Sequence, residues 1–162
     1  MISFLLPILC GVIFLIADQI SKAYFLANFT LGQSAEFIPG IIDFVYIHNT
    51  GSAWGMFSGK TIFLIVISLI VMAVCIGILI KLKNNNMLMT WSIILVLSGG
   101  IGNLIDRVFR GGKVVDFLHF EFYPEFPVFN IADCAVVIGG GLLILAYVLD
   151  IVKESKNKNA KN

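Results

Sequence analysis

Four stretches of this sequence contain no Asp, Glu, Lys or Arg, and they constrain the fold more than any other feature: residues 1–17, 61–80, 87–105 and 134–149. A helix that crosses about 30 Å of hydrocarbon needs about 20 apolar residues. The second and third stretches reach that length, and the others do so if Asp18 and Asp133 lie at an interface. Because 59% of the residues are hydrophobic and 13% are charged, against about 25% charged in soluble domains, the chain is not an ordinary soluble protein.

We therefore predict an all-α membrane protein, a single integral membrane domain of residues 1–162 with four transmembrane helices at about 2–27, 60–80, 87–109 and 131–152. Between the first two helices, residues 32–59 are rich in β-branched and aromatic residues, broken by Pro39-Gly40 and Gly51. Such a pattern favours short strands and turns. We expect a small β-structured platform there, a second loop at residues 110–130 and a basic tail at residues 153–162.

The basic residues predict the orientation of the chain in the membrane. Lys81, Lys83 and the four lysines of the tail lie on the side that both termini share, and the positive-inside rule makes that side the cytoplasm. The platform and the second loop are then extracytoplasmic. The tail lysines suit contact with anionic membrane lipids, whereas a net charge of +1 gives no reason to expect a nucleic-acid partner. The first apolar stretch lacks a basic n-region and a small-x-small cleavage site, so we expect a retained helix rather than a cleaved signal peptide.

No motif in the sequence predicts a metal site or a cofactor. The three cysteines lie in apolar stretches without CxxC spacing. His48 and His119, the two histidines, lie in different connections, and no HExxH motif is present. We therefore expect neither a zinc centre nor a bound cofactor.

Three acids are expected at the outer ends of the helices: Asp106, Asp116 and Asp133. Two of them end an Asn-x-x-Asp frame, which begins at Asn103 and at Asn130. Residues three apart share one face of a helix, so each Asn is expected beside its own Asp. An ionisable group at membrane depth costs about 2.5–3.5 kcal/mol on insertion scales, and it is a functional hypothesis by default.

The neighbours of these acids predict different roles for them. Asp106 is followed by Arg107 and, one turn later, by Arg110, so we expect it to be a structural ion-pair partner. Asp116 lies among valines and a phenylalanine, an apolar setting that should raise its pKa, and Asp133 would be desolvated in a similar way. Two carboxyl groups forced together share one proton. Such a pair can activate water for peptide hydrolysis without a metal or a covalent intermediate.

The acids also fit other interpretations. Each acid taken alone fits a structural ion pair equally well. A small membrane transporter could use the acids as ion or proton relays, although transport predicts acids distributed through the depth of the bilayer. A non-enzymatic membrane scaffold would explain the glycines but not the repeated Asn-x-x-Asp frame.

Five short motifs together resemble the lipoprotein signal peptidases, also called signal peptidase II. The resemblance covers nearly the whole chain, with the motifs in the family's order and spacing, and it implies a four-helix aspartic protease of the bacterial cytoplasmic membrane. The motifs are "ADQISK" (17–22), "HNTGSAWG" (48–55), "GNLIDR" (102–107), "VVDF" (114–117) and "FNIAD" (129–133).

The resemblance also implies roles for single residues. Asp116 and Asp133 correspond to the family's catalytic pair, and the supporting polar residues near the substrate or the pair would be Asn49, Asn103, Arg107 and Asn130. Asp18 and Lys22, one helical turn apart, are expected to form a structural pair. The chain departs from the family pattern at His48, where arginine is common, and at Ser52, where alanine is common.

The implied substrate is a prolipoprotein whose cysteine carries a diacylglyceryl group, cut on the N-terminal side of that cysteine. Its signal peptide would lie among the helices and its lipid would stay in the bilayer. The active site would then lie near the extracytoplasmic face, and we expect the protein to act as a monomer. Trp54 is a candidate substrate contact or interfacial anchor.

Overall fold

The computed structural model describes residues 2–82 and 86–159. Lys83 and Lys161, which contribute to the predicted charge bias, lie outside the described residues. Within the described ranges, four helices are long and apolar enough to cross a membrane, which confirms the predicted fold class. They are α1 (Ile2–Asn28), α2 (Thr61–Lys81), α3 (Met87–Phe109) and α4 (Ile131–Asn159).

Helix α3 lies at the centre of the bundle and contacts each of the other three helices. Its closest partner is α4, because glycine lets the two backbones approach. A Cβ atom on Gly99 would overlap the carbonyl oxygen of Ala132 and lie 2.7 Å from Val136 Cγ2. Small residues commonly permit such approaches between membrane helices. This contact fixes the height of the first turn of α4 against the last turns of α3.

A three-stranded antiparallel sheet caps one end of the bundle, in the order β1 (Ser34–Ile38), β2 (Ile42–Asn49), β3 (Val114–Phe120), within the part of the chain that the structure describes. Strands β1 and β2 form the platform predicted between the first two helices. Strand β3 comes from the connection between α3 and α4, which was expected to be a loop. Its first four residues are all buried, so this segment is a core strand and not a surface connection.

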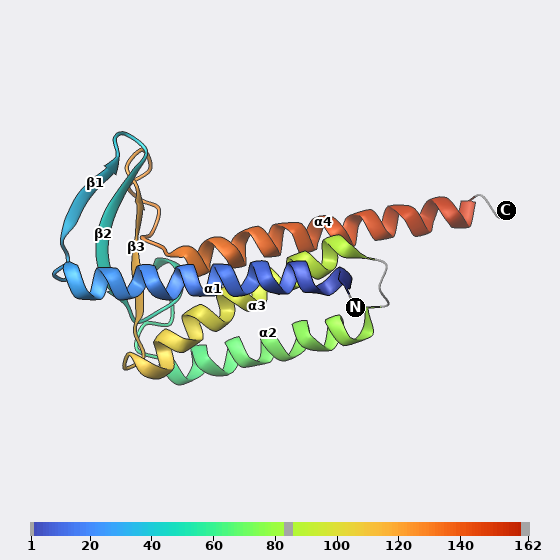
Figure 1. Cartoon of the computed structure of the whole chain (residues 1–162), viewed down its shortest axis with the longest axis horizontal. Coiled ribbons are helices and arrows are strands. Elements are labelled where there is room, and N and C mark those ends of the chain that lie inside the picture. The colour runs from blue at the N-terminus through green and yellow to red at the C-terminus, as the bar shows by residue number, and fades with distance from the viewer. Residues whose placement is uncertain (1, 83–85, 160–162) are drawn as a thin grey trace.

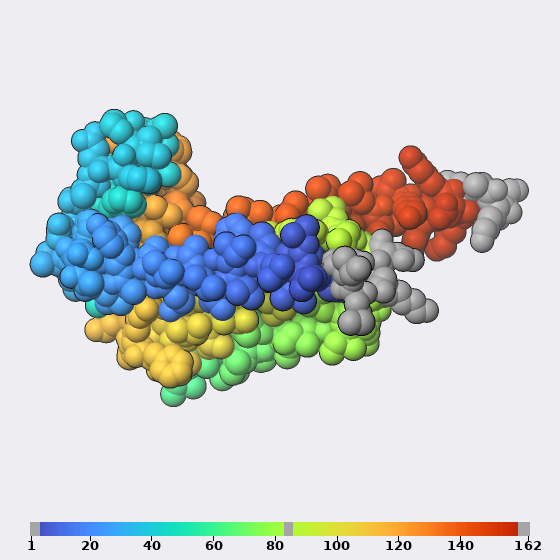
Figure 2. Space-filling model, viewed as in Figure 1, coloured from blue at the N-terminus to red at the C-terminus, as the bar shows by residue number. Residues whose placement is uncertain are grey.

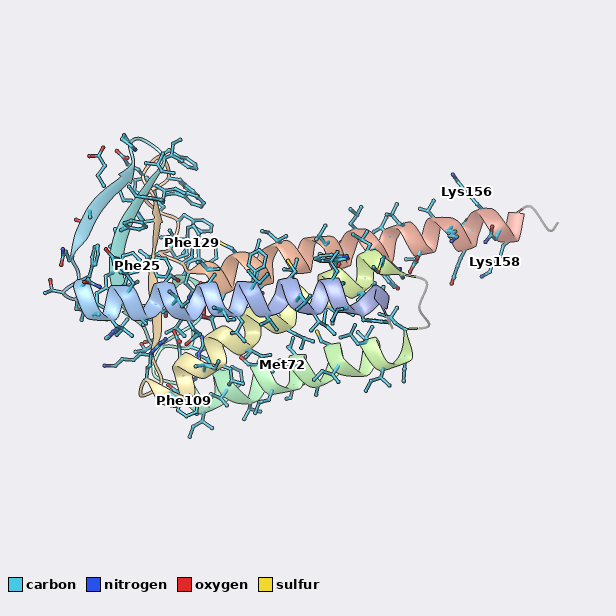
Figure 3. The ribbon with its side chains drawn as sticks, viewed as in Figure 1. Phe25, Met72, Phe109, Phe129, Lys156 and Lys158 are labelled. Atoms are coloured by element: carbon cyan, nitrogen blue, oxygen red, sulfur yellow. The ribbon has the colours of Figure 1, made fainter. Side chains whose placement is uncertain are left out.

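An aromatic core joins the sheet to α1. Phe25 of α1 stacks on Phe117 of β3 with ring centroids 4.3 Å apart, and Tyr46 and Val115 complete the buried cluster. Figure 3 places Phe25 and Phe129 near the sheet and Lys156 and Lys158 at the far end of α4. Aromatic packing therefore sets the position of β3 relative to the helices.

The sheet lies at one end of the helix bundle (Figure 1). Helix α1 begins and α4 ends at the end opposite the sheet, as an even number of membrane crossings requires. The sheet also extends sideways past the helices, so that it rises from one side of the bundle end (Figure 2). Strand β3 follows the end of α3 and leads toward the start of α4, and β2 lies beside it in the sheet.

Candidate active site

Strand β3 carries Asp116, whose carboxyl group is 1% exposed. Successive strand residues point to opposite faces, so Asp116 points away from Val115 and Phe117, which pack in the aromatic core. Its Oδ2 accepts a hydrogen bond from Asn49 Nδ2 at 3.0 Å, and its Oδ1 accepts one from Asn130 Nδ2 at 2.6 Å. Burial, and secondarily the negative charge of Asp133, raise the pKa of Asp116 to about 7.

The first turn of α4 carries Asp133, which forms a reciprocal cap with Asn130. Asp133 Oδ2 accepts from the backbone N–H of Asn130 at 3.1 Å, while Asn130 Oδ1 accepts from the backbone N–H of Asp133 at 2.9 Å. This is the geometry of a capping box, in which side chains at the N-cap and N3 positions satisfy each other's backbone donors. The Asn130-x-x-Asp133 frame therefore caps the N-terminus of α4, and the same hydrogen bonds hold the Asp133 carboxyl group in a fixed orientation.

Asn130 connects the two acids. It is fully buried, and it donates from Nδ2 to Asp116 while its backbone donates to Asp133. Asn103 reaches the same place from α3, because its Nδ2 donates to Asp133 Oδ1 at 2.7 Å. The structure thus brings Asp116 and Asp133 together at the junction of β3 with α4, and each carboxyl group accepts two N–H donors.

Asn103 and Asp106 both contact Lys22 Nζ, at 3.0 Å and 3.1 Å, but no hydrogen bond joins the two side chains directly among the described residues. The equivalent spacing works at Asn130 because that residue caps a helix, whereas Asn103 lies inside α3, where no free backbone donor holds it. The close approach of α4 at Gly99 puts Asp133 within reach, and the carboxylate there is the better partner.

A second polar cluster lies next to the two acids, where α1 meets α3. Lys22, Asp18 and Asp106 are each no more than 1% exposed, with Lys22 Nζ 3.0 Å from Asp18 Oδ2 and 3.1 Å from Asp106 Oδ2. Arg110 pairs with Asp106 from the other side. Asp106 Oδ2 also accepts from the backbone N–H of Val115 at 3.0 Å, which ties the cluster to β3. The expected Asp18–Lys22 pair is present, within a larger network.

Arg107 does not pair with Asp106, its neighbour in the sequence, but contacts backbone carbonyl groups. Its Nη2 donates to the carbonyl oxygen of Gly51 at 2.9 Å, and Nη1 lies 3.5 Å from the carbonyl oxygen of Asn103. Its Nε is buried without a partner among the described residues. Adjacent helical residues point in different directions, so Arg107 leaves Asp106 to Arg110. It attaches the loop after β2 to the end of α3.

That loop, residues 50–59, covers the face of β2 that carries Asn49. Asn49 Oδ1 accepts from the backbone N–H of Gly51 at 2.8 Å, which turns its amide nitrogen toward Asp116. Trp54 adopts a left-handed φ of 54° and is 66% exposed, with its ring 5.9 Å from that of Phe126. A surface pocket of about 330 Å³ is lined by Trp54 and by residues of the end of β2, the 50–59 loop and the segment before α4: Ile47, His48, Asn49, Thr50, Gly55, Ser58, Pro127 and Val128.

His48 does not supply the cation that arginine would bring. Its Nε2 lies 2.7 Å from the hydroxyl group of Tyr46 on the α1 side of the sheet. Burial, and then the positive charge of Lys113, lower the pKa of His48, so the ring is neutral at pH 7. Among residues 2–82 and 86–159, no three His, Cys, Asp or Glu side chains are grouped so that they could hold a metal ion.

The family described as signal peptidase (SPase) II matches residues 10–149. The chain belongs to the signal peptidase II family. This membership confirms the resemblance in the five motifs, and it makes the protein a membrane peptidase.

Proteins named lipoprotein signal peptidase are similar to this chain along most of their length. That of Enterococcus faecalis is 41% identical over 90% of this chain and 89% of its own, and that of Lactobacillus johnsonii is 39% identical over 92% and 95%. Two solved bacterial membrane enzyme structures have the same fold. One has a TM-score of 0.81 at 34% identity over 94% of this chain and 90% of its own, and the other 0.79 at 37% over 87% and 91%.

Gln19 was not predicted from the sequence to be part of the polar cluster. Its Nε2 donates to Asp18 Oδ2 at 3.0 Å and to the carbonyl oxygen of Gly102 at 3.2 Å. The available signal was a glutamine directly after an acid inside a helix that is otherwise apolar. The contact of Lys22 with Asn103 at 3.0 Å was also missed, since nothing in the spacing of the two residues relates them.

Proposed function

We propose that this signal peptidase II is an aspartic endopeptidase in which Asp116 and Asp133 form the catalytic pair. One observation carries the proposal: a single buried residue, Asn130, hydrogen-bonds both carboxyl groups. Asp116 is buried and Asp133 is half-buried, and two carboxyl groups held together in such a setting cannot both ionise, so they share one proton. The chemistry of the pair is therefore that of an acid and a base side by side.

In this mechanism the ionised carboxyl group takes a proton from a water molecule as the water attacks the scissile carbonyl carbon. The neutral carboxyl group donates its proton to the carbonyl oxygen, which gives a tetrahedral diol. When the C–N bond breaks, the neutral carboxyl group gives its proton to the leaving amine and the ionised carboxyl group takes a proton from a hydroxyl group of the diol, so the pair again holds one proton. A pKa of about 7 for Asp116 means that the pair retains a proton near neutral pH, as the acid step requires.

The supporting residues orient the pair and the substrate. Asn49, Asn103 and Asn130 each direct an N–H group at one of the four carboxyl oxygens, so the remaining lone pairs face the reacting water. Arg107 holds the 50–59 loop by the carbonyl oxygen of Gly51. In this proposal, Arg107 holds the loop in position against the backbone of the substrate.

The substrate is a prolipoprotein with a diacylglyceryl-modified cysteine, cut on the N-terminal side of that cysteine. The signal peptide lies in the membrane beside the helices, and the lipid chains remain in the bilayer. The pair lies at the sheet end of the bundle, which is the extracytoplasmic side if the lysine-rich end faces the cytoplasm. A bond next to a lipid-anchored cysteine reaches this depth without leaving the membrane surface.

The test is cleavage of a diacylglyceryl-modified precursor peptide by the purified protein in detergent. Asp116→Asn and Asp133→Asn should each abolish cleavage while the protein stays folded, because an amide can neither take the proton from water nor return it. Asp43→Asn is the matched control, since Asp43 lies on the same sheet, opposite His119, away from the pair. Cleavage at the parental rate by either pair variant would remove that residue from the mechanism.

A further inference from the structure

Lys22 has more contacts than a structural ion pair needs. Its side chain is fully buried, and Nζ lies 3.0 Å from Asp18 Oδ2, 3.1 Å from Asp106 Oδ2 and 3.0 Å from Asn103 Oδ1. An ammonium group has three donors and no acceptor. Two of the donors therefore serve carboxylates, and the third points at the residue that hydrogen-bonds Asp133.

This third contact decides which way the Asn103 amide faces. Asn103 Oδ1 accepts from Lys22 Nζ at 3.0 Å and from Asn130 Nδ2 at 3.1 Å. The opposite orientation would place the NH₂ group of Asn103 against two sets of donors. With the oxygen held there, the NH₂ group has to face Asp133 Oδ1, 2.7 Å away.

We propose that Lys22 is a positioning residue of the proteolytic reaction, which acts through Asn103 to hold one carboxyl group of the catalytic pair in its ionised, proton-accepting form. This role rests on the proposed pair of Asp116 and Asp133 and goes beyond it. The ammonium group polarises the Asn103 amide, whose N–H then donates more strongly to Asp133, and its own charge favours a single negative charge on the pair.

The charges around the pair agree in direction with this role. Burial and the charge of Asp133 raise the pKa of Asp116, and Lys22 acts against both of them. The neutral His48 of β2 lies on the opposite face of the sheet with Tyr46. The charged groups that face the pair or its supports from the neighbouring helices are Asp18 and Lys22 of α1 and Asp106, Arg107 and Arg110 of α3.

The test compares pH profiles of kcat and KM for cleavage of the lipidated precursor in detergent. Removing a nearby cation makes ionisation of the pair harder, so the form with one negative charge is populated only at higher pH. Lys22→Met should move the acidic limb of the kcat profile upward by about 1 pH unit or more. It should also lower kcat by at least about 10-fold through the loosened Asn103 amide. KM should change little, because Lys22 is fully buried and does not contact substrate.

Arg110→Gln is the matched control. This cation belongs to the same cluster and pairs with Asp106, yet no hydrogen bond joins it to Asn103 among the described residues. A purely structural role for the cluster predicts that both variants lose stability and keep the parental acidic limb. Our proposal predicts the shift for Lys22→Met alone, and an equal shift in Arg110→Gln would overturn it.

Loss of Lys22 leaves two buried acids with one fewer cation, which is strongly destabilising. If Lys22→Met does not accumulate, the test compares the single variant Asp18→Asn with the double variant Asp18→Asn/Lys22→Met. The double variant removes one charge of each sign and should therefore be less destabilised. An unshifted acidic limb in the double variant, or failure of every Lys22 variant to fold, assigns Lys22 to stability alone and refutes the proposal. Active Asp116→Asn or Asp133→Asn would instead refute the catalytic pair, so the two failures are distinguishable.

Discussion

Substitution of Gly99 by alanine tests whether the spacing of α3 and α4 sets the geometry of the proposed catalytic pair, Asp116 and Asp133. The added Cβ would overlap the carbonyl oxygen of Ala132 and lie 2.7 Å from Val136 Cγ2. Carbon atoms in ordinary contact are about 3.5–4.0 Å apart, so the helices have to separate by about 1 Å at this level. Ala132 directly precedes Asp133, and Asn103 lies one turn along α3 from Gly99.

The separation should therefore lengthen the 2.7 Å bond between Asn103 Nδ2 and Asp133 Oδ1 to a distance at which it no longer counts as a hydrogen bond. A displacement of about 1 Å in an active site costs on the order of 100-fold in rate. Overpacking of this kind lowers the free energy of unfolding by about 1–3 kcal/mol. We expect Gly99→Ala to lose about 100-fold in kcat for the lipidated precursor and to unfold at a lower temperature.

Gly100→Ala is the control in the same helix turn. A Cβ on Gly100 would lie 3.7 Å from Met72 Cγ, an ordinary contact on the α2 side. Because alanine favours a helix interior by about 1 kcal/mol over glycine, this variant should keep parental activity and gain slightly in stability. Parental kcat and unfolding temperature in Gly99→Ala would show that the close approach does not govern the pair.

Two further predictions concern charge. For Asp116 the folded pKa, about 7, lies above the ordinary value of 3.8, so the folded protein binds the extra proton between these values and its free energy of unfolding falls as pH rises through this window. The stability of Asp116→Asn relative to the parent should therefore rise by roughly 3 kcal/mol between pH 5 and pH 8. Thermal or denaturant unfolding in detergent measures this. A stability difference between the two proteins that stays constant with pH would contradict the buried, protonated state of Asp116. Asp106→Asn leaves Lys22 and Arg110 with one fewer anion at a fully buried site and should cost about 3–5 kcal/mol, while Asp150→Asn, at an exposed position of α4, should change stability little. A stable, folded but wholly inactive Asp106→Asn would contradict its structural assignment.

The helices of this protein follow from its sequence because length and absence of charge suffice to define a membrane span. The convergence of Asp116 with Asp133 was also predictable, since each acid lies in an apolar run and the motif order matched a known family. Strand β3 was not foreseen, because an apolar run with one acid in a connection between spans gives no alternating pattern. Its partners lie far away in the chain, on β2.

The polar contacts across helices were the least predictable part of the site. The spacing of Asn103 and Asp106 satisfies the rule for neighbours on one helix, yet Asn103 turns to α4. That choice depends on how near another backbone comes, and Gly99 decides it through packing that no local pattern encodes. The contact between Lys22 and Asn103 was also not predictable, because it depends on the packing of α1 against α3. This contact decides how the Asn103 amide faces Asp133.

The two carboxyl groups of the proposed pair are supplied by different kinds of secondary structure. Asp116 is on the sheet, beyond the ends of the spans, and Asp133 is in the first turn of a membrane helix. The position between the two carboxyl groups therefore lies where the sheet meets the first turn of α4, a junction that Asn130 holds together. We expect a substrate to be cut only where its scissile bond lies level with this junction, so the distance of that bond from the membrane should matter as well as the sequence around it.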